Sequence, residues 1–291
     1  MLSENKDFLS PNSVSNTCQE QKFLSKFLQE TLAMTKRLFI QLWRRPSTLI
    51  AGIVQPFMWL ILFGALFHNA PEGIFESNIN YAKFLSPGII VFTAFSGSLN
   101  AGLPIMFDRE FGFLSRLLVA PLSSRYSIVA SSTLYIVSLS LLQTGVIIIA
   151  SSMLGAGIPN IYNLAAIILV VLLTVCGVTG MSLGIAFALP GHIELIAVIF
   201  VTNLPLLFAS TALAPLSFMS RWLQVIASLN PLTYAIEFIR YIYVYGNLSM
   251  NDIVFKAPFI ELTGIKILLL LLGFDMLVLL SIQPLLRRKF N

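Results

Sequence analysis

The chain has 291 residues, of which 57% are hydrophobic and only 11% are charged, and its mean hydropathy is +0.86. Soluble domains carry about 25% charged residues, so this composition excludes a soluble globular protein and indicates an integral membrane protein. The isoelectric point near 9.3 would suit a nucleic-acid-binding protein. However, the basic residues cluster at the ends of apolar segments, as the positive-inside rule describes, and we expect no nucleic-acid partner.

The first 45 residues separate into two parts. Residues 1–20 are rich in Ser and Asn and predict a disordered polar tail. Residues 21–45 alternate apolar residues with Lys and Arg at helical spacing, and Trp43 stands near their end. This pattern predicts an amphipathic helix lying in the plane of the membrane surface.

The remainder, residues 46–289, predicts a polytopic all-α fold with six transmembrane helices. A span needs about 20 apolar residues to cross a hydrocarbon core of about 30 Å. Six segments meet this requirement: residues 48–67, 84–106, 126–154, 161–189, 195–213 and 267–286.

The segment from Leu213 to Gly246 is too apolar for an ordinary loop, yet its charged residues exclude a simple span. A re-entrant helical hairpin between the fifth and sixth spans satisfies both facts, provided that protein covers its irregular backbone. Asn230 followed by Pro231 should begin its second helix, because Asn is a favoured N-cap and Pro is favoured at the first helical position.

Six spans place both termini on the same side of the membrane. Of the 18 Lys and Arg residues, 13 lie before the first span, in residues 107–125, or after the last span. The positive-inside rule therefore predicts that these parts are cytoplasmic or, in an organelle, stromal. No apolar signal-peptide core follows the N-terminus, so we expect synthesis in the compartment from which the chain inserts, in a bacterium or an organelle with its own genome.

A charged segment interrupts the apolar sequence at residues 107–121. Asp108, Arg109, Glu110 and Arg116 would together cost on the order of 10 kcal/mol at the centre of a bilayer, so this segment must lie in water. Its apolar residues nevertheless recur at helical spacing, at Phe107, Phe111, Leu114 and Leu118. We expect a short amphipathic helix, closed by Pro121, that is offered to a partner.

The chain carries no catalytic motif. It contains no Gly-Lys dipeptide and hence no P-loop, and its sequence offers neither a cluster of metal ligands nor paired carboxylates on one intramembrane helix face. We expect no catalytic residue, no metal and no cofactor held by this chain itself.

A few polar or helix-bending residues lie inside the predicted spans. Asp275 falls near the middle of the sixth span, and intramembrane acids are rare and often functional. It either packs its helix against the bundle or lines a substrate pathway, and the same alternatives apply to Asn203 in the fifth span. Pro205, in the same span, either kinks the helix or belongs to such a site. Gly180 and Gly184 predict a close helix–helix contact, within the chain or in a dimer.

Three motifs together resemble a known family. Asp108-Arg109-Glu110 with Gly112 and Leu117–Pro121 look like the cytoplasmic signature of ATP-binding cassette (ABC) permeases of the type 2 integral membrane family. Asn230-Pro231-Leu232-Thr233-Tyr234 with Arg240 is similar to that family's second signature, and Arg44-Arg45-Pro46 to its usual entry into the first span. The resemblance covers residues 35–286. In its short length and its richness in Ile, Phe, Ser and Asn, the sequence looks most like cyanobacterial and algal plastid-encoded members.

The resemblance implies half of a transporter. Two permease subunits, identical or different, would pair in the lipid membrane, and each would bind a separate ATPase subunit that carries ATP and Mg²⁺. Residues 107–120 would be the cytoplasmic coupling helix, whose charged residues pair at the docking cleft while Phe111 and Leu114 fill an apolar groove. The implied coupling residues are Asp108, Arg109, Glu110, Phe111, Gly112, Leu114 and Arg116, and the implied re-entrant signature is Asn230, Pro231, Tyr234 and Arg240.

We therefore expect the permease subunit of an ABC-type exporter, in a plastid (chloroplast) membrane or a cyanobacterial plasma membrane. An ATP-independent carrier or channel for a hydrophobic or amphipathic solute is the alternative. An intramembrane enzyme acting on lipid is a third reading, which the lack of a polar catalytic cluster disfavours.

Overall fold

The computed structural model describes residues 11–67, 81–119, 123–246, 251–257 and 260–290, and most of these are helical. The α-helices are α1 (Pro11–Arg44), α2 (Pro46–Leu66), α3 (Tyr81–Leu99), α4 (Gly102–Glu110), α5 (Phe113–Val119), α6 (Tyr126–Ser151), α7 (Ile161–Ala188), α8 (His192–Phe208), α9 (Arg221–Leu229), α10 (Pro231–Tyr245) and α11 (Gly264–Phe290). A π-helical turn, η1 (Ser152–Ala156), ends α6, and a 3₁₀ turn, η2 (Leu216–Phe218), follows α8.

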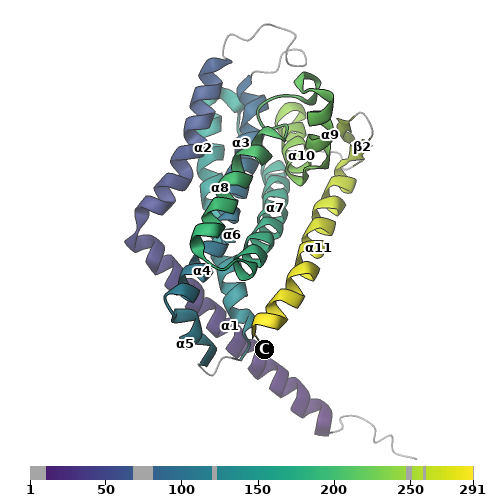
Figure 1. Cartoon of the computed structure of the whole chain (residues 1–291). Helices are drawn as coiled ribbons and strands as arrows, with labels where there is room; N and C mark the ends of the chain where they lie inside the picture. Colours follow the sequence, from purple (N-terminus) through teal and green to yellow (C-terminus); the bar gives the residue numbers. More distant parts are fainter. Residues whose placement is uncertain (1–10, 68–80, 120–122, 247–250, 258–259, 291) are drawn as a thin grey trace, which may run out of the picture.

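The helices form an elongated bundle around α3 (Figure 1). Helix α3 packs against α2, α6, α7 and α10, while α11 packs along α7. The largest hydrophobic cluster surrounds α3, where Leu85, Ile89 and Phe92 are almost completely buried. Helix α1, helix α5 and the end of α11 lie at one end of the bundle, and α9, α10 and a small β-hairpin lie at the opposite end (Figure 1).

Helices α1 and α2 meet at a sharp elbow. Arg45, between them, has φ −131° and ψ 68°, because a residue before proline is disfavoured in the α conformation, and Pro46 then begins α2. Helix α1 packs one side against α6, with Thr31, Thr35 and Leu38 buried. It starts at Pro11 rather than at the expected Gln21; proline is well suited to a first helical turn. Residues 1–10 lie outside the described residues.

Five described helical segments are long and apolar enough to cross a membrane. They are Pro46–Leu66, Tyr81–Glu110 (α3 with α4), Tyr126–Ala156 (α6 with η1), Ile161–Ala188 and Gly264–Pro284. The expected fifth span, residues 195–213, is represented by α8, which has only 17 residues. At 1.5 Å per residue this helix extends about 26 Å, less than a complete hydrocarbon core.

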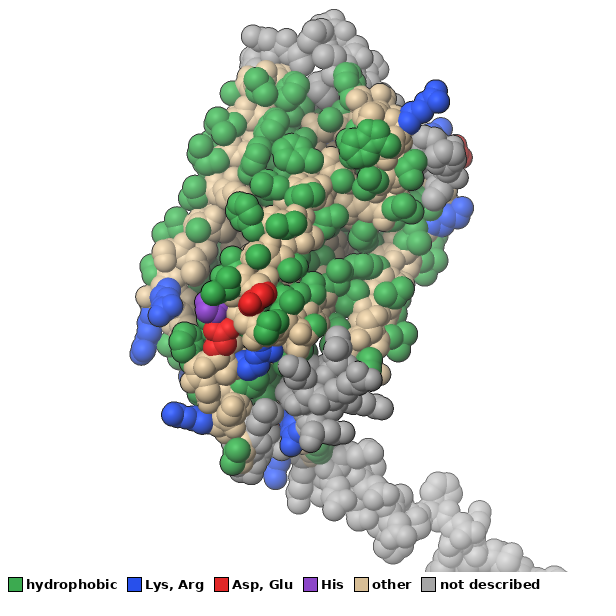
Figure 2. Space-filling view, viewed as in Figure 1, with side chains coloured by type: hydrophobic (Ala, Val, Ile, Leu, Met, Phe, Trp, Pro, Cys, Tyr) green, Lys and Arg blue, Asp and Glu red, His purple; other side chains and the backbone are tan. Residues whose placement is uncertain are grey.

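The outer surfaces of these helices are strongly apolar. On α11 alone, Leu269, Leu272, Leu277 and Leu280 are each more than half exposed. Figure 2 shows hydrophobic side chains over the middle of one face, with charged side chains gathered toward its lower end and upper right corner. A continuous apolar surface of this kind is untenable in water, and it agrees with a polytopic membrane protein.

The mostly helical structure agrees with the expected all-α fold, and it adds one small β-hairpin that the sequence did not predict. Strands β1 (Ile253–Ala257) and β2 (Ile260–Thr263) pair antiparallel just before α11. Phe255 and Leu262 are buried, whereas Lys256 and Glu261 lie opposite each other across the strands. This alternation of apolar and charged residues is typical of a strand with one covered face.

Small residues allow α7 and α11 to approach closely. A Cβ atom added to Gly180 would lie 2.8 Å from Val278 Cγ1, and one added to Gly184 would lie 3.1 Å from Ile282 Cγ1. The structure thus places this Gly-x-x-x-Gly motif against α11 of the same chain.

Candidate functional site: the charged junction at residues 107–119

The expected single helix over residues 107–121 is in fact divided. Residues 107–110 complete α4, Phe111 and Gly112 form a turn, and α5 begins at Phe113. Gly112 has φ +74°, a left-handed conformation that glycine adopts at little cost, and this turn breaks the helical spacing. Pro121, the predicted end of the helix, lies outside the described residues.

Asp108 joins α4 to α1. Arg37 donates two hydrogen bonds to its carboxylate, at 2.8 Å from Nη1 to Oδ2 and at 2.6 Å from Nη2 to Oδ1. The same guanidinium lies 3.8 Å from the centre of the Phe113 ring at the start of α5. Bidentate Arg–carboxylate pairs fix orientation as well as distance, so Arg37 holds α1, α4 and α5 in one arrangement.

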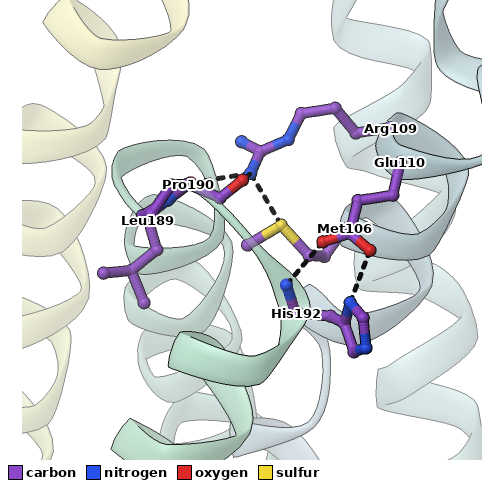
Figure 3. Close-up of polar contacts among 6 residues, drawn as sticks. All are labelled: Met106, Arg109, Glu110, Leu189, Pro190 and His192. Atoms are coloured by element: carbon purple, nitrogen blue, oxygen red, sulfur yellow. Dashed lines mark hydrogen bonds and ion pairs between the residues drawn. The ribbon is translucent and has the colours of Figure 1, made fainter.

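Arg109 reaches the turn between α7 and α8. Its guanidinium donates to the carbonyl oxygens of Ala186, Leu189 and Pro190, at 3.2, 2.7 and 2.6 Å, and also contacts Met106 Sδ (Figure 3). The last carbonyls of a helix have no partner within it and carry partial negative charge. The positively charged guanidinium of Arg109 therefore caps the C-terminal end of α7.

Glu110 binds the beginning of α8. Its Oε1 accepts a hydrogen bond of 2.6 Å from the backbone N–H of His192, and Oε2 contacts Nδ1 of the same residue (Figure 3). A carboxylate at a helix N-terminus satisfies free N–H groups and the helix dipole. The His192 backbone N–H, together with its imidazole and nearby Arg109, holds the pKa of the Glu110 carboxyl below its ordinary value.

The exposed side chains of residues 111–119 differ in part from those expected. Leu114 is buried in its own chain, in a cluster with Ile105 and Ile128. Phe111 and Val119 are instead 79% and 87% exposed, and Arg116 is exposed between them in the sequence. The exposed surface of this segment therefore includes Phe111, Arg116 and Val119, with Leu114 beneath it.

The three intramembrane candidates do not form one site. Asp275, on α11, lies against Gly177 of α7, and its buried Oδ1 has no hydrogen-bond partner among the described residues. Asn203, on α8, donates to Ser96 Oγ of α3 at 3.2 Å. Pro205 is exposed within α8. A pathway role for these residues stays a prediction.

At the opposite end, the second signature holds helices together. Asn230 caps α10 by accepting from the Leu232 N–H at 3.0 Å, and Pro231 is the first residue of that helix, as predicted. The Asn230 amide also donates to the carbonyls of Leu206 and Ala209, at 3.1 and 2.8 Å. Tyr234 donates to the Ser228 carbonyl at 2.5 Å.

Arg240 is buried, pairs with Glu237, and lies 3.8 Å from the centre of the Phe84 ring. It also donates to the carbonyls of Phe84 and Thr211, at 3.3 and 2.5 Å. The charged pair that argued against a simple span is thus satisfied inside the protein.

The sequence did not predict which residues pair with Asp108, Glu110 and Ser123. Arg37 and Glu30 belong to α1, and Glu30 Oε1 accepts from the Ser123 backbone N–H and hydroxyl, each at 2.8 Å. His192 is the first residue of α8, directly after the turn between α7 and α8. Nothing in the spacing of these residues pairs them with residues 108–123, because each contact joins elements more than 70 residues apart.

Comparison with known proteins identifies the family. Residues 29–244 match the model of the ABC-2 type transporter family. The chain is 52% identical over 266 residues, 91% of each sequence, to a protein of Porphyra purpurea named "Putative transport permease ycf38". It is 51% identical over 264 residues, again 91% of each, to the protein of that name from Cyanophora paradoxa.

A more distant relative is the "Probable doxorubicin resistance ABC transporter permease protein DrrC" of Mycobacterium tuberculosis. It is 28% identical over 227 residues, which cover 74% of this chain and 76% of that protein. The family match spans the charged junction, which contains the first signature, and the second signature at residues 230–240. The chain is therefore a multi-pass transport permease that belongs to the ABC-2 type transporter family.

Proposed function

We propose that this chain is the membrane subunit of an ABC-type exporter and forms the substrate pathway as a dimer. Each subunit would bind a separate ATPase at the end of the bundle that carries residues 107–119. That end would face the cytoplasm or stroma, together with both termini, in keeping with the distribution of Lys and Arg. ATP and Mg²⁺ would bind to the ATPase, and this chain would perform no catalysis of its own.

The observation that carries the proposal is the way three consecutive charged residues attach three elements to one short segment. Asp108 holds α1, Arg109 holds the end of α7, and Glu110 holds the start of α8. A push on the exposed surface formed by Phe111, Arg116 and Val119 would reach all three through short, charge-assisted hydrogen bonds. Charge-assisted hydrogen bonds are stronger than neutral ones, so they can transmit a displacement of this segment to the neighbouring helices.

The proposal also includes a sixth crossing of the membrane. We propose that α8 and the turn that follows it, residues 209–213, make the remaining crossing, since α8 alone extends about 26 Å. Helices α9 and α10 would then form a re-entrant hairpin that returns to the end from which it entered. The buried Asn230 and Arg240 suit this role, because their hydrogen bonds satisfy carbonyls left free at the ends of helices.

The substrate class is proposed from the character of the bundle. The described membrane segments carry few fixed charges, which suits an amphipathic or hydrophobic cargo such as a lipid, a lipid-linked glycan or a hydrophobic small molecule. The relatives that share about half of the sequence are the proteins named "Putative transport permease ycf38" from Porphyra purpurea and Cyanophora paradoxa. In keeping with the resemblance to algal and cyanobacterial members, a plastid membrane or a cyanobacterial plasma membrane is the proposed location.

A co-purification experiment tests the proposal. Phe111→Asp and Val119→Asp change exposed side chains and leave the contacts of Asp108, Arg109 and Glu110 in place. We expect both variants to lose the ATPase subunit from detergent extracts, and ATP-driven transport in proteoliposomes to fall in parallel. Ile158→Asp is the matched control, since Ile158 is 82% exposed in the loop between η1 and α7.

Two outcomes would contradict the proposal. An ATPase that stays bound to both variants would remove residues 107–119 from the docking surface. Transport that proceeds at the same rate without any ATPase would instead favour an ATP-independent carrier or channel.

A further inference from the structure

A groove with a volume of about 650 Å³ lies inside the elbow between α1 and α2. Leu38, Leu42, Pro104, Phe107, Phe111 and Tyr135 supply its apolar wall, from α1, α4, α6 and the turn that follows α4. Arg44, Arg45 and Thr48 stand along the side where α1 passes into α2. Its volume falls within the range of about 300–1,000 Å³ that small-molecule sites occupy.

The position of the groove determines what can fill it. Helix α2, which rises from the elbow, is apolar and mostly exposed, so the groove opens beside a surface that faces hydrocarbon. Water gains too few hydrogen bonds to fill an apolar cavity stably. An acyl chain meets no such cost, because it exchanges one apolar environment for another.

The charges beside the groove select the headgroup. Arg44 and Arg45 are exposed, and neither forms an ion pair with another residue that the structure describes. Asp108, the acid that lines the groove, already accepts both hydrogen bonds of Arg37. Two guanidinium groups without a carboxylate partner at the membrane surface attract an anionic headgroup and can bind a phosphate in a bidentate manner.

We propose that this groove is a binding site for one anionic phospholipid. An acyl chain would lie against Leu38, Leu42 and Phe107, and the phosphate would lie on Arg44 and Arg45. The bound lipid would fill the angle between the surface helix α1 and the transmembrane helix α2, beside the Arg37–Asp108 contact. The site goes beyond the proposed export function, since it requires only that the chain lies in a membrane.

Native mass spectrometry of the purified full-length protein provides the test. The protein is first exchanged into phosphatidylcholine and then titrated with phosphatidylglycerol. We expect one phosphatidylglycerol molecule to be retained in preference to phosphatidylcholine. The double variant Arg44→Gln/Arg45→Gln should weaken this retention by about tenfold or more, because each basic residue near the surface contributes to anionic lipid binding.

Two further variants distinguish lipid binding in the groove from lipid attraction by diffuse surface charge. Arg116→Gln/Arg125→Gln removes the same charge from exposed positions at the same end of the bundle, outside the groove, and should retain the lipid. Gln41→Trp fills the groove from an exposed position on α1 while both arginines remain, and should lose it. Melting temperatures of all variants control for folding.

The proposal is overturned if the wild type does not prefer phosphatidylglycerol, if both double variants lose lipid equally, or if Gln41→Trp retains it. It is also overturned if the groove variants release the ATPase while lipid retention stays unchanged. That result would assign the groove to a protein partner.

Discussion

At the scale of the residue, Asp108, Arg109 and Glu110 illustrate how consecutive positions on a helix serve different neighbours. Successive side chains on an α-helix point about 100° apart, so three in a row do not share a face. In this structure they address α1, the α7–α8 turn and the start of α8 respectively. Their contacts position the segment, whereas Phe111 and Val119 remain exposed.

The Arg37–Asp108 contact allows a direct measurement of this positioning. We expect Arg37→Ala and Asp108→Ala each to lower stability, and the double variant to lose less than the sum of the two. Because both side chains are partly exposed, the coupling should be about 0.5–1 kcal/mol. Thermal unfolding of the purified variants in detergent measures it, and strictly additive losses would show that the pair contributes nothing.

Asn230 performs two tasks that substitutions can separate. Asn230→Ser keeps an oxygen that can cap α10 but cannot make both donations to the α8 carbonyls. Asn230→Ala loses the cap as well, which costs about 1–2 kcal/mol. We expect stability to fall in the order wild type, Ser, Ala in a thermal unfolding series. Equal stability of the Ser and Ala variants would mean that the cap itself is unimportant here.

At the scale of the element, the turn at Gly112 decides the direction of α5. Its φ of +74° costs about 1–2 kcal/mol for most residues, whereas Asn tolerates it better than others do. We expect Gly112→Val to reduce ATP-driven transport strongly and Gly112→Asn to retain most of it. Proteoliposome transport at equal protein loading compares the two, and equal loss in both variants would point to a need for the bare glycine backbone.

Helix α3 is held at the centre of the bundle by a close contact at Gly88. A Cβ atom there would lie 2.7 and 2.8 Å from the backbone Cα and carbonyl carbon of Ala212, and backbone atoms yield little. We expect Gly88→Ala to lower the melting temperature by several degrees, as overpacking costs about 1–3 kcal/mol.

Gly145→Ala on α6 is the matched control for Gly88→Ala, since a Cβ atom added there would meet no neighbouring atom within 4 Å. It should be neutral or stabilising, because alanine has the higher helix propensity. Similar losses at both positions would refute the argument from close packing.

At the scale of the whole molecule, local patterns predicted the elements and long-range contacts did not follow from them. Hydropathy placed five spans within a few residues of their observed ends, because a membrane helix must be apolar along its own length. The division at Gly112 was missed, since the apolar spacing of Phe107, Phe111 and Leu114 continues through a positive φ. The β1–β2 hairpin was missed because so short a segment carries little periodicity.

The arrangement of the two ends of the bundle leads to a test of the orientation. Phe111 and Val119 lie at the end that carries α1 and the end of α11, and Trp222, on α9, lies at the other (Figure 1). All three side chains are largely exposed, at 79%, 87% and 67% respectively. Single cysteines at these positions, in a chain with Cys18→Ser and Cys176→Ala, can therefore report the side of the membrane that each end faces.

We expect a membrane-impermeant maleimide to label Trp222→Cys in sealed spheroplasts of a bacterial expression host, and to label Phe111→Cys and Val119→Cys only after the membrane is opened. The reason is electrostatic: the end with residues 107–125 carries most of the Lys and Arg residues, and such ends are retained on the side of synthesis. Permeabilised cells provide the control, since all three cysteines should then react. Labelling of Phe111→Cys in sealed cells would show that the topology is the opposite of the one proposed. It would also place the proposed ATPase contact on a side where no ATP is available, and the coupling proposal would fail with it.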